Sequence, residues 1–504
     1  MNRYALLAAF LCASAAWSQT SSSSVHSSST NCNTLPIINP SKGFTANFNN
    51  SCYALSFTGS SGGSSGGDSN ATYKQVFYQV NPGYQLVVLG TFPNARFMSV
   101  SLYDGHSTLL SALFDYQIPP LSNSMTNPYV TGATYTSGQM YGLTVSFGGG
   151  PPKTVAAGCS TSSSNVGENV LDATQLHQGF SWNGAPGLPA GFPVHQSGPN
   201  IGGTMMIREY MGISTEAAPV VIVRQLTNGC ALPLAQAESM NIISVTQSLS
   251  SSSWLNQPQI QAHHEYYSTA TLSPTGCYPG DPNNQIQWIR SSDWVGRNNS
   301  AAAYASAILP PTTLQGLFSG QNFIRVQFPL PTTPSIPCAS GCSLTGNEQV
   351  RYLSVEFLYA APSSATSTGS STTLIALNDT SFVLDPNRNV TLIVGLGGTP
   401  PAEVSAANYY TYLDLTKVAG YQNFNSVLVR TLLPNPLFDC STFNVPSYTM
   451  EYNPLGGFMG EFVPTVDFPD GDNLLGPPVP PVRPNSCGAV PPPPTACTVT
   501  RTPV

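Results

Sequence analysis

The chain has 504 residues, of which only 8% are charged, and its formal net charge is −7. Ordinary soluble domains carry about 25% charged residues, so this protein must rely on uncharged polar side chains for solubility. The acidic balance and the lack of basic clusters argue against nucleic acid as a partner, because nucleic-acid binding needs Lys and Arg to neutralise phosphates.

The N-terminus predicts export. A positively charged start precedes an apolar run over 6–13 that is too short to span a bilayer. Ala16 and Ser18 then place small residues at the −3 and −1 positions of a cleavage site. We expect a signal peptide over 1–18 and a Ser-rich leader over 19–31; the alternative is an N-terminal membrane anchor. No later run reaches the length of a transmembrane helix, so we expect the mature chain to be secreted or held at the cell surface.

The cysteines are consistent with an oxidising compartment. Eleven occur, and the ten that follow the signal peptide form an even number, which in an exported chain indicates disulfide bonds. The spacing leaves the connectivity open, but short loops favour three pairs: Cys32–Cys52, Cys338–Cys342 and Cys487–Cys497. No Cys-x-x-Cys spacing occurs, so a zinc site is not expected.

Strand patterns dominate the rest of the chain. The 44 Gly and 45 Pro leave few windows for a long helix. Short runs rich in Val, Ile, Tyr, Phe and Thr recur between turn residues, as at 84–89, 97–103, 220–223 and 390–394. Several alternate apolar with polar residues, as a strand with one buried face does. The sequence therefore predicts an all-β protein.

The chain also repeats itself. Three segments of the first half have counterparts in the second half, in the same order: 95–103 with 350–359, 143–152 with 392–401, and 221–226 with 427–432. Such ordered self-similarity indicates a duplication. We predict two tandem, internally duplicated β-sandwich domains of jelly-roll-like type over 32–250 and 255–470, followed by a proline-rich tail over 476–504.

The first of these segments contains a recurring motif, Arg-aromatic-x-Ser-Val followed by Tyr. It begins at Arg96 in one copy and at Arg351 in the other. The motif resembles a strand found in uncharacterised exported bacterial proteins of β-sandwich type. The resemblance covers a small part of the chain, implies the fold and carries no activity.

Arg96 and Arg351 are the first candidate ligand-binding residues. An arginine can bind a carboxylate or a sugar hydroxyl through its planar fork of donors. The alternative is an internal pair, Arg96 with Asp104 or Asp115, because a buried guanidinium needs a partner. The repetition of the arginine in both halves favours this structural role.

Aromatic clusters are the second candidate. Trp288 and Trp294 follow closely behind Tyr266 and Tyr267. Aromatic faces stack on sugar rings while amides and carboxylates bond the hydroxyls, a chemistry that needs no cofactor. The alternative is that these rings pack in a core or between the domains.

One acidic turn is a candidate metal site. Asp467, Asp470 and Asp472 offer oxygen ligands of the kind that Ca²⁺ prefers, although no bidentate Glu follows as in an EF-hand. A plain acidic turn is the alternative, and we expect no other cofactor.

These features favour a secreted, non-enzymatic protein that binds an extracellular glycan, another polymer or a cell-surface protein. One alternative is a secreted glycan hydrolase, which needs two carboxylates about 5–10 Å apart across a cleft. Asp104, Asp115, Glu209 and Glu265 would be the candidates, but the sequence does not show which of them lie close together. The other alternative is a structural component of the cell envelope.

Overall fold

The computed structural model describes residues 55–56, 58–61, 67–80, 82–103, 109–150, 152, 170–174, 201–212, 219–240, 242–244, 287–290, 301–309, 323–335, 337, 343–360, 371–397, 399–435, 438, 440, 442, 450–452, 462, 464–469 and 474–475. These residues form 21 strands with very little helix, which confirms the all-β prediction. Among them, no helix is long and apolar enough to cross a membrane.

Residues of the first half of the chain form two sheets. The first outer sheet has the strand order β1 (Leu55–Ser56), β10 (Val220–Gln225), β4 (Tyr84–Thr91), β7 (Met140–Ser146) and β8 (Val170–Asp172). The first inner sheet has the order β11 (Ile243–Ser244), β3 (Ala71–Val80), β9 (Ile201–Tyr210), β5 (Phe97–Tyr103) and β6 (Leu109–Phe114), and β2 (Thr58–Ser61) pairs with β3. A short helix, α1 (Leu234–Ser239), precedes β11.

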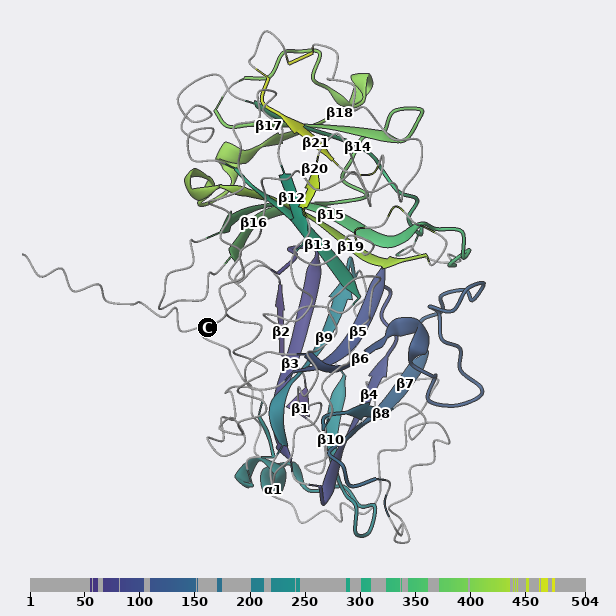
Figure 1. Cartoon of the computed structure of the whole chain (residues 1–504). Coiled ribbons are helices and arrows are strands. Elements are labelled where there is room, and N and C mark those ends of the chain that lie inside the picture. The colour runs from purple at the N-terminus through teal and green to yellow at the C-terminus, as the bar shows by residue number, and fades with distance from the viewer. Residues whose placement is uncertain are drawn as a thin grey trace, which may run out of the picture.

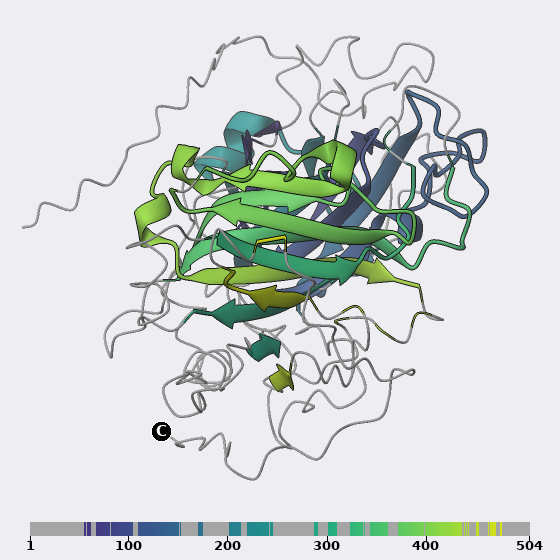
Figure 2. The ribbon, with the colours of Figure 1, turned by 90° about the horizontal axis from the view of Figure 1, so that it is seen from above.

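The second half repeats this arrangement. Its inner sheet has the order β16 (Ser371–Asn378), β15 (Val350–Ala360), β19 (Ser426–Pro434), β13 (Ala302–Ile308), β12 (Gln287–Arg290) and β20 (Met450–Tyr452). Its outer sheet has the order β18 (Tyr410–Asp414), β17 (Asn389–Gly395), β14 (Phe323–Pro329) and β21 (Thr465–Asp467). Seen from above, the second outer sheet lies over the second inner sheet, and the strands of the first half run beneath both at an angle (Figure 2).

Each half has its own hydrophobic core between its outer and inner sheets. Val88 and Val100 lie in the first core, and Val326 and Val355 lie in the second. The two inner sheets meet at the middle of the molecule (Figure 1). An inner sheet is therefore covered on both faces, which explains why all ten residues of β9 are buried.

The strand orders confirm the duplication. In the inner sheets β3 corresponds to β13, β9 to β19, β5 to β15 and β6 to β16; in the outer sheets β10 corresponds to β21, β4 to β14, β7 to β17 and β8 to β18. Both outer sheets end in a parallel pair, β7 with β8 and β17 with β18, next to otherwise antiparallel neighbours. The first two repeats found in the sequence are these equivalent strands, β5 with β15 and β7 with β17.

The third sequence match was wrong. Segment 221–226 lies largely in β10 of the first outer sheet, whereas 427–432 lies in β19 of the second inner sheet. The structural counterpart of β19 is β9, and Arg430 corresponds to Arg208. The register shows this: Ser99 pairs with Arg208 across β5 and β9, and the equivalent Ser354 pairs with Arg430 across β15 and β19. An apolar run that ends in arginine is a generic strand pattern, and it misled the alignment.

Candidate binding site at the junction of the two halves

The faces of the two inner sheets meet in an aromatic contact. The ring of Tyr210 in the first half lies 5.8 Å from Phe97 and 5.2 Å from Tyr352 of the second half, measured between centroids. Ala302 and Leu432 join the same buried cluster. Tilted aromatic pairs at these distances add to the stabilisation gained from burial alone, so the junction is a packed interface.

Two ion pairs cross this junction reciprocally. Arg96 Nη1 of the first half lies 2.7 Å from Asp379 Oδ2 of the second, and Arg351 Nη1 of the second half lies 3.3 Å from Asp115 Oδ2 of the first. The arginines begin the equivalent motifs, and the aspartates directly follow the equivalent strands β6 and β16. Each half thus presents the same arginine and the same aspartate to the other, as the subunits of a two-fold dimer do.

Burial controls the electrostatics of these pairs. The Arg96 and Asp379 side chains are only 3% and 2% exposed, and the Asp115 side chain is fully buried. Burial raises the pKa of Asp115 from 3.8 to about 6, although Arg351 and the backbone amides of Met98 and Tyr116 act in the opposite direction.

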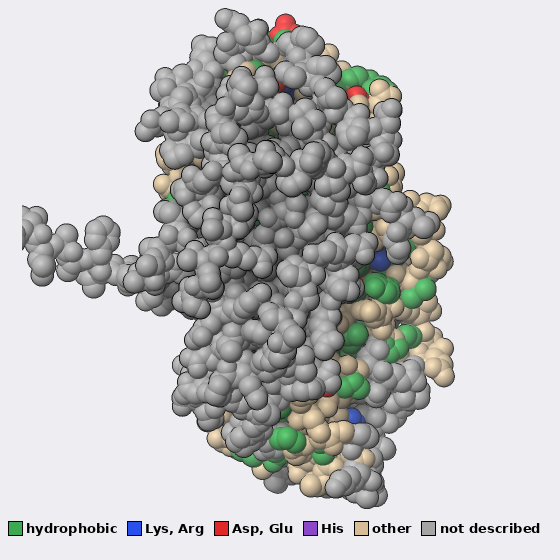
Figure 3. Space-filling model, viewed as in Figure 1, with side chains coloured by type: hydrophobic (Ala, Val, Ile, Leu, Met, Phe, Trp, Pro, Cys, Tyr) green, Lys and Arg blue, Asp and Glu red, His purple; other side chains and the backbone are tan. Residues whose placement is uncertain are grey.

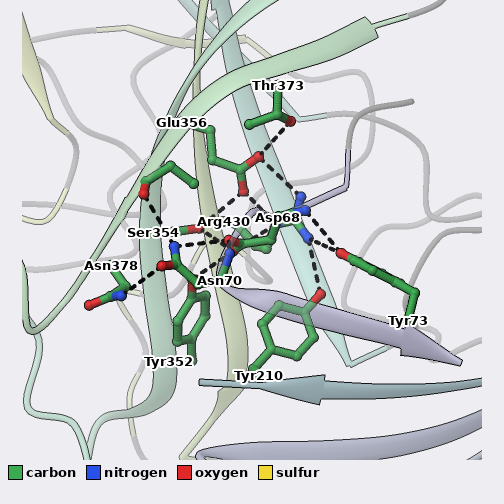
Figure 4. Close-up of polar contacts among 11 residues, drawn as sticks. Asp68, Asn70, Tyr73, Tyr210, Tyr352, Ser354, Glu356, Thr373, Asn378 and Arg430 are labelled. Carbon is green, nitrogen blue, oxygen red and sulfur yellow. Dashed lines mark hydrogen bonds and ion pairs between the residues drawn. The ribbon is translucent and has the colours of Figure 1, made fainter. Parts of the chain in front are cut away.

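A buried polar network lies beside the ion pairs (Figure 4). Asp68, which precedes β3, reaches from the first half into the second inner sheet. Its Oδ2 accepts hydrogen bonds from the Tyr352 hydroxyl at 2.6 Å and from Ser354 Oγ at 2.9 Å. The guanidinium of Arg430 lies between Asp68 and Glu356, with Nε 3.8 Å from Asp68 Oδ2 and 2.7 Å from Glu356 Oε1.

Glu356 is the second carboxyl group of this network. Arg430 Nη2 and Thr373 Oγ1 donate to its Oε2 at 3.2 and 3.3 Å. Burial raises the pKa of Glu356 from 4.5 to about 7; Arg430 opposes the rise and Asp68 adds to it. Arg430 remains protonated, because Glu356 and the surrounding tyrosines raise its pKa further above the ordinary value despite burial.

The first half lacks the counterpart of Glu356. Ser101 occupies the equivalent position, and Arg208 Nη1 donates to its hydroxyl at 3.4 Å. The guanidinium of Arg208 lies over the rings of Tyr73 and Tyr103, 5.8 and 5.3 Å from their centroids. Cation–π contacts with aromatic rings therefore stabilise the charge of Arg208, whereas the carboxylate of Glu356 stabilises the charge of Arg430. Both networks are buried between the two halves, so we interpret them as part of the interface that joins the halves.

A pocket opens beside the Arg96–Asp379 pair. Its volume is about 410 Å³, and both halves line it. The lining residues are Arg96, Met211, Leu330, Thr333, Pro334, Ser335, Pro337, Asp379, Thr380, Leu384 and Arg388. We call this the junction pocket. It combines apolar walls with hydroxyl and charged groups, which is the composition of small-molecule sites.

The junction pocket contains two residues with left-handed backbone conformations. Met211 has φ 51° and Arg388 has φ 63°. Residues other than glycine are strained in this region because of their Cβ atom. Such strain concentrates at functional sites, so the backbone geometry supports the assignment of this pocket as the candidate site.

The structure places the predicted arginines at the junction. Arg96 and Arg351 are paired internally: Asp379 binds Arg96, while Asp115, one of the two partners predicted for Arg96, binds Arg351. The other predicted partner, Asp104, lies outside the described residues. The sequence suggested partners within the same half, whereas the reciprocal packing exchanges them between the halves. Arg96 also lines the junction pocket.

The other predicted sites fall largely outside the described residues. The structure describes the backbone of Trp288, which lies in β12 and is paired with Glu451 of β20. Asp467 accepts a bidentate interaction from the Nε and Nη2 atoms of Arg325, so both of its carboxylate oxygens are engaged. Outside the described ranges lie Trp294, Tyr266, Tyr267, Asp470, Asp472 and the six cysteines of the predicted pairs, Cys32, Cys52, Cys338, Cys342, Cys487 and Cys497. In the described part of the chain, no group of three His, Cys, Asp or Glu residues could hold a metal ion.

Sequence reasoning missed Asp68, Glu356, Asp379 and Arg388. A signal for Asp379 was present: Ala-Leu-Phe-Asp over 112–115 and Ala-Leu-Asn-Asp over 376–379 end equivalent strands. No comparable signal identifies Asp68 or Arg388, because turns carry them and their neighbours are set by the packing.

Comparisons with known proteins identify no family. No family model matches the chain, and no curated protein matches it. Among solved structures, it is similar to an uncharacterised protein from Burkholderia cenocepacia, with 11% identity, a TM-score of 0.38 and 85% of each chain covered. It is also similar to the VPA0106 protein from Vibrio parahaemolyticus, with 8% identity and a TM-score of 0.32; the match covers 73% of this chain and 85% of that one.

Proposed function

We propose that the protein is an exported, non-enzymatic binding protein and that it holds part of an extracellular glycan in the junction pocket. The observation that carries the proposal is the pocket itself. Its volume of about 410 Å³ falls within the range of ligand sites, which is roughly 300–1,000 Å³.

The lining suits a sugar. Ser335 offers a hydroxyl group that can exchange hydrogen bonds with sugar hydroxyls. The hydroxyls of Thr333 and Thr380 donate to Asp379 and Asn378, and their oxygens can accept hydrogen bonds from a sugar. Pro334 and Leu384 offer apolar surface for the C–H faces of a sugar ring. Where the face in Figure 3 is coloured for described residues, most of the visible side chains are hydrophobic or uncharged polar, and only a few are Lys, Arg, Asp or Glu.

Export is part of the same proposal. Cys230 and Cys440 are each disulfide-bonded. Structural disulfides form and persist in oxidising compartments, so these two residues support the export that the N-terminal sequence predicts.

The carboxyl groups with raised pKa values favour binding over hydrolysis. A glycosidase needs its acid in a cleft with a second carboxylate across the scissile bond. Asp115 and Glu356 have raised pKa values, but each is fully buried against an arginine and neither lines the pocket. Their burial in the interface accounts for the shifts without catalysis.

The test is a pull-down of the mature protein on a panel of insoluble polysaccharides, with an assay for released soluble sugar. We expect retention without release. Ser335→Trp fills the mouth of the pocket at an exposed position and should abolish retention. Ser124→Trp, at an exposed serine outside the pocket, is the matched control and should be retained like the wild type.

Two results would overturn the proposal. Release of sugar would identify a hydrolase. Failure to be retained on every polysaccharide would exclude the glycan and leave a protein partner or an envelope role, the latter recognisable by ordered self-assembly.

A further inference from the structure

The charges in the junction pocket do not balance. Arg96 is neutralised by Asp379, whose Oδ2 also accepts a hydrogen bond from Thr333 Oγ1 at 2.8 Å. Arg388 is the second cation of the lining, and it is exposed. Within the described part of the chain, its guanidinium donates a hydrogen bond to the carbonyl of Pro331, at 3.3 Å, and forms no ion pair with a carboxylate. The lining therefore carries one positive charge in excess in a protein whose net charge is −7.

The nearest acidic residue of the same turn does not neutralise this charge. Asp385 Oδ1 accepts the backbone N–H groups of Asn387 and Asn389 at 2.8 and 2.7 Å, and its Oδ2 accepts Asn389 Nδ2 at 2.8 Å. The carboxylate of Asp385 is thus turned into the loop and shapes it, so the guanidinium of Arg388 remains available to a ligand.

The backbone at Arg388 adds a second, independent observation. Its φ of 63° belongs to the left-handed region, where glycine or asparagine fits best. A Gly at this position would relieve the strain and keep the turn. The turn instead carries one of only 16 basic residues of the chain, and strain of this kind is retained where function requires the side chain.

We propose that the junction pocket binds an acidic sugar unit and that Arg388 binds its carboxylate. The inference deepens the proposed function and rests on it. A guanidinium matches a carboxylate by two parallel hydrogen bonds, while the hydroxyls of Ser335 and Thr380 lie in the same lining to meet the hydroxyls of the sugar ring.

The test compares matched polymers. The full mature chain is applied to immobilised polygalacturonate and alginate, to the same polymers after reduction of their carboxyl groups, and to dextran sulfate. We expect retention on at least one polyuronate, a loss of at least tenfold in affinity after reduction of that polymer, and weaker binding at high salt because the contact is partly exposed.

Two variants separate a ligand contact from a structural role. Arg388→Gly should lower affinity for the polyuronate at least tenfold and yet raise the melting temperature by about 2–4 °C, because the left-handed strain is relieved. A merely structural arginine would lose stability on this change. Lys417→Gln removes an exposed cation outside the pocket and should change neither quantity.

The outcomes distinguish this inference from the proposed function. Equal retention on the polyuronate and its reduced form would overturn the acidic ligand and leave glycan binding intact. If the protein were retained on dextran sulfate alone and Arg388→Gly abolished that retention, the proposed carboxylate ligand would be overturned and a sulfate group would take its place. Retention on none of these polymers, with retention on a neutral polysaccharide, would also overturn the inference, and retention on no glycan at all would overturn both.

Discussion

At the scale of single residues, Glu356 links burial to pH. Its pKa is raised from 4.5 to about 7, so between these values the folded state binds a proton that the unfolded chain has released. The free energy of unfolding therefore falls as the pH rises through this window and is highest on its acidic side. Asp115 acts in the same direction between 3.8 and about 6.

We predict that the protein is more stable at pH 5 than at pH 8, and that Glu356→Gln removes roughly 1–3 kcal/mol of this difference. Urea denaturation at a series of pH values measures it. Glu403→Gln, at an exposed glutamate, is the control and should leave the dependence of the free energy of unfolding on pH unchanged. If Glu356→Gln left the pH dependence of the free energy of unfolding unaltered, a group other than Glu356 would be responsible for it.

At the scale of elements, the equivalent strands β5 and β15 provide an internal comparison. Ser99 and Ser354 occupy the same position and are both fully buried. Ser354 Oγ lies 2.9 Å from Asp68 Oδ2 and 3.0 Å from Glu356 Oε1, whereas Ser99 Oγ has no hydrogen-bond partner among the residues that the structure describes. The duplication preserved the residue, and only the second copy uses its hydroxyl.

The same substitution should therefore have different effects in the two strands. Ser354→Ala removes one buried hydrogen-bond donor from the carboxylates of Asp68 and Glu356, which keep Tyr352 and Arg430 as partners, and should lower the free energy of unfolding by about 1–3 kcal/mol. Ser99→Ala removes an unsatisfied hydroxyl and should be neutral or slightly stabilising. Chemical denaturation of both variants checks this, and equal losses would contradict the assigned network.

Prediction from sequence succeeded where a pattern is local. The strands at 84–89, 97–103 and 390–394 were predicted because their apolar residues recur at strand spacing, and the structure confirms them as β4, β5 and β17. The partners of Arg96 and Arg351 could not be predicted, because they lie 283 and 236 residues away in the sequence. Arg388 shows the same limit, since only the three-dimensional packing brings its turn to the pocket.

At the scale of the whole molecule, the reciprocal ion pairs hold the halves in register. Asp115→Asn leaves Arg351 without its anionic partner at the interface, and we expect it to lower the free energy of unfolding by about 3 kcal/mol. We also expect the halves to unfold in two separate transitions, because the change weakens their junction and not their cores. Differential scanning calorimetry resolves this, with Lys417→Gln as the surface control that should show no effect. A single transition at the wild-type temperature would contradict the prediction.

The exchange of arginine and aspartate between the halves also has a consequence for biogenesis. The first half completes its two sheets within residues 55–244, but the partners of its inner face are supplied by residues beyond 300. While the chain emerges, a surface bearing Phe97, Tyr210, Arg96 and Arg208 stays uncovered until the second half has been made. During that interval a second nascent copy offers the same face, with the same complementary charges, so intermolecular pairing is the characteristic folding error to expect of this protein at high expression.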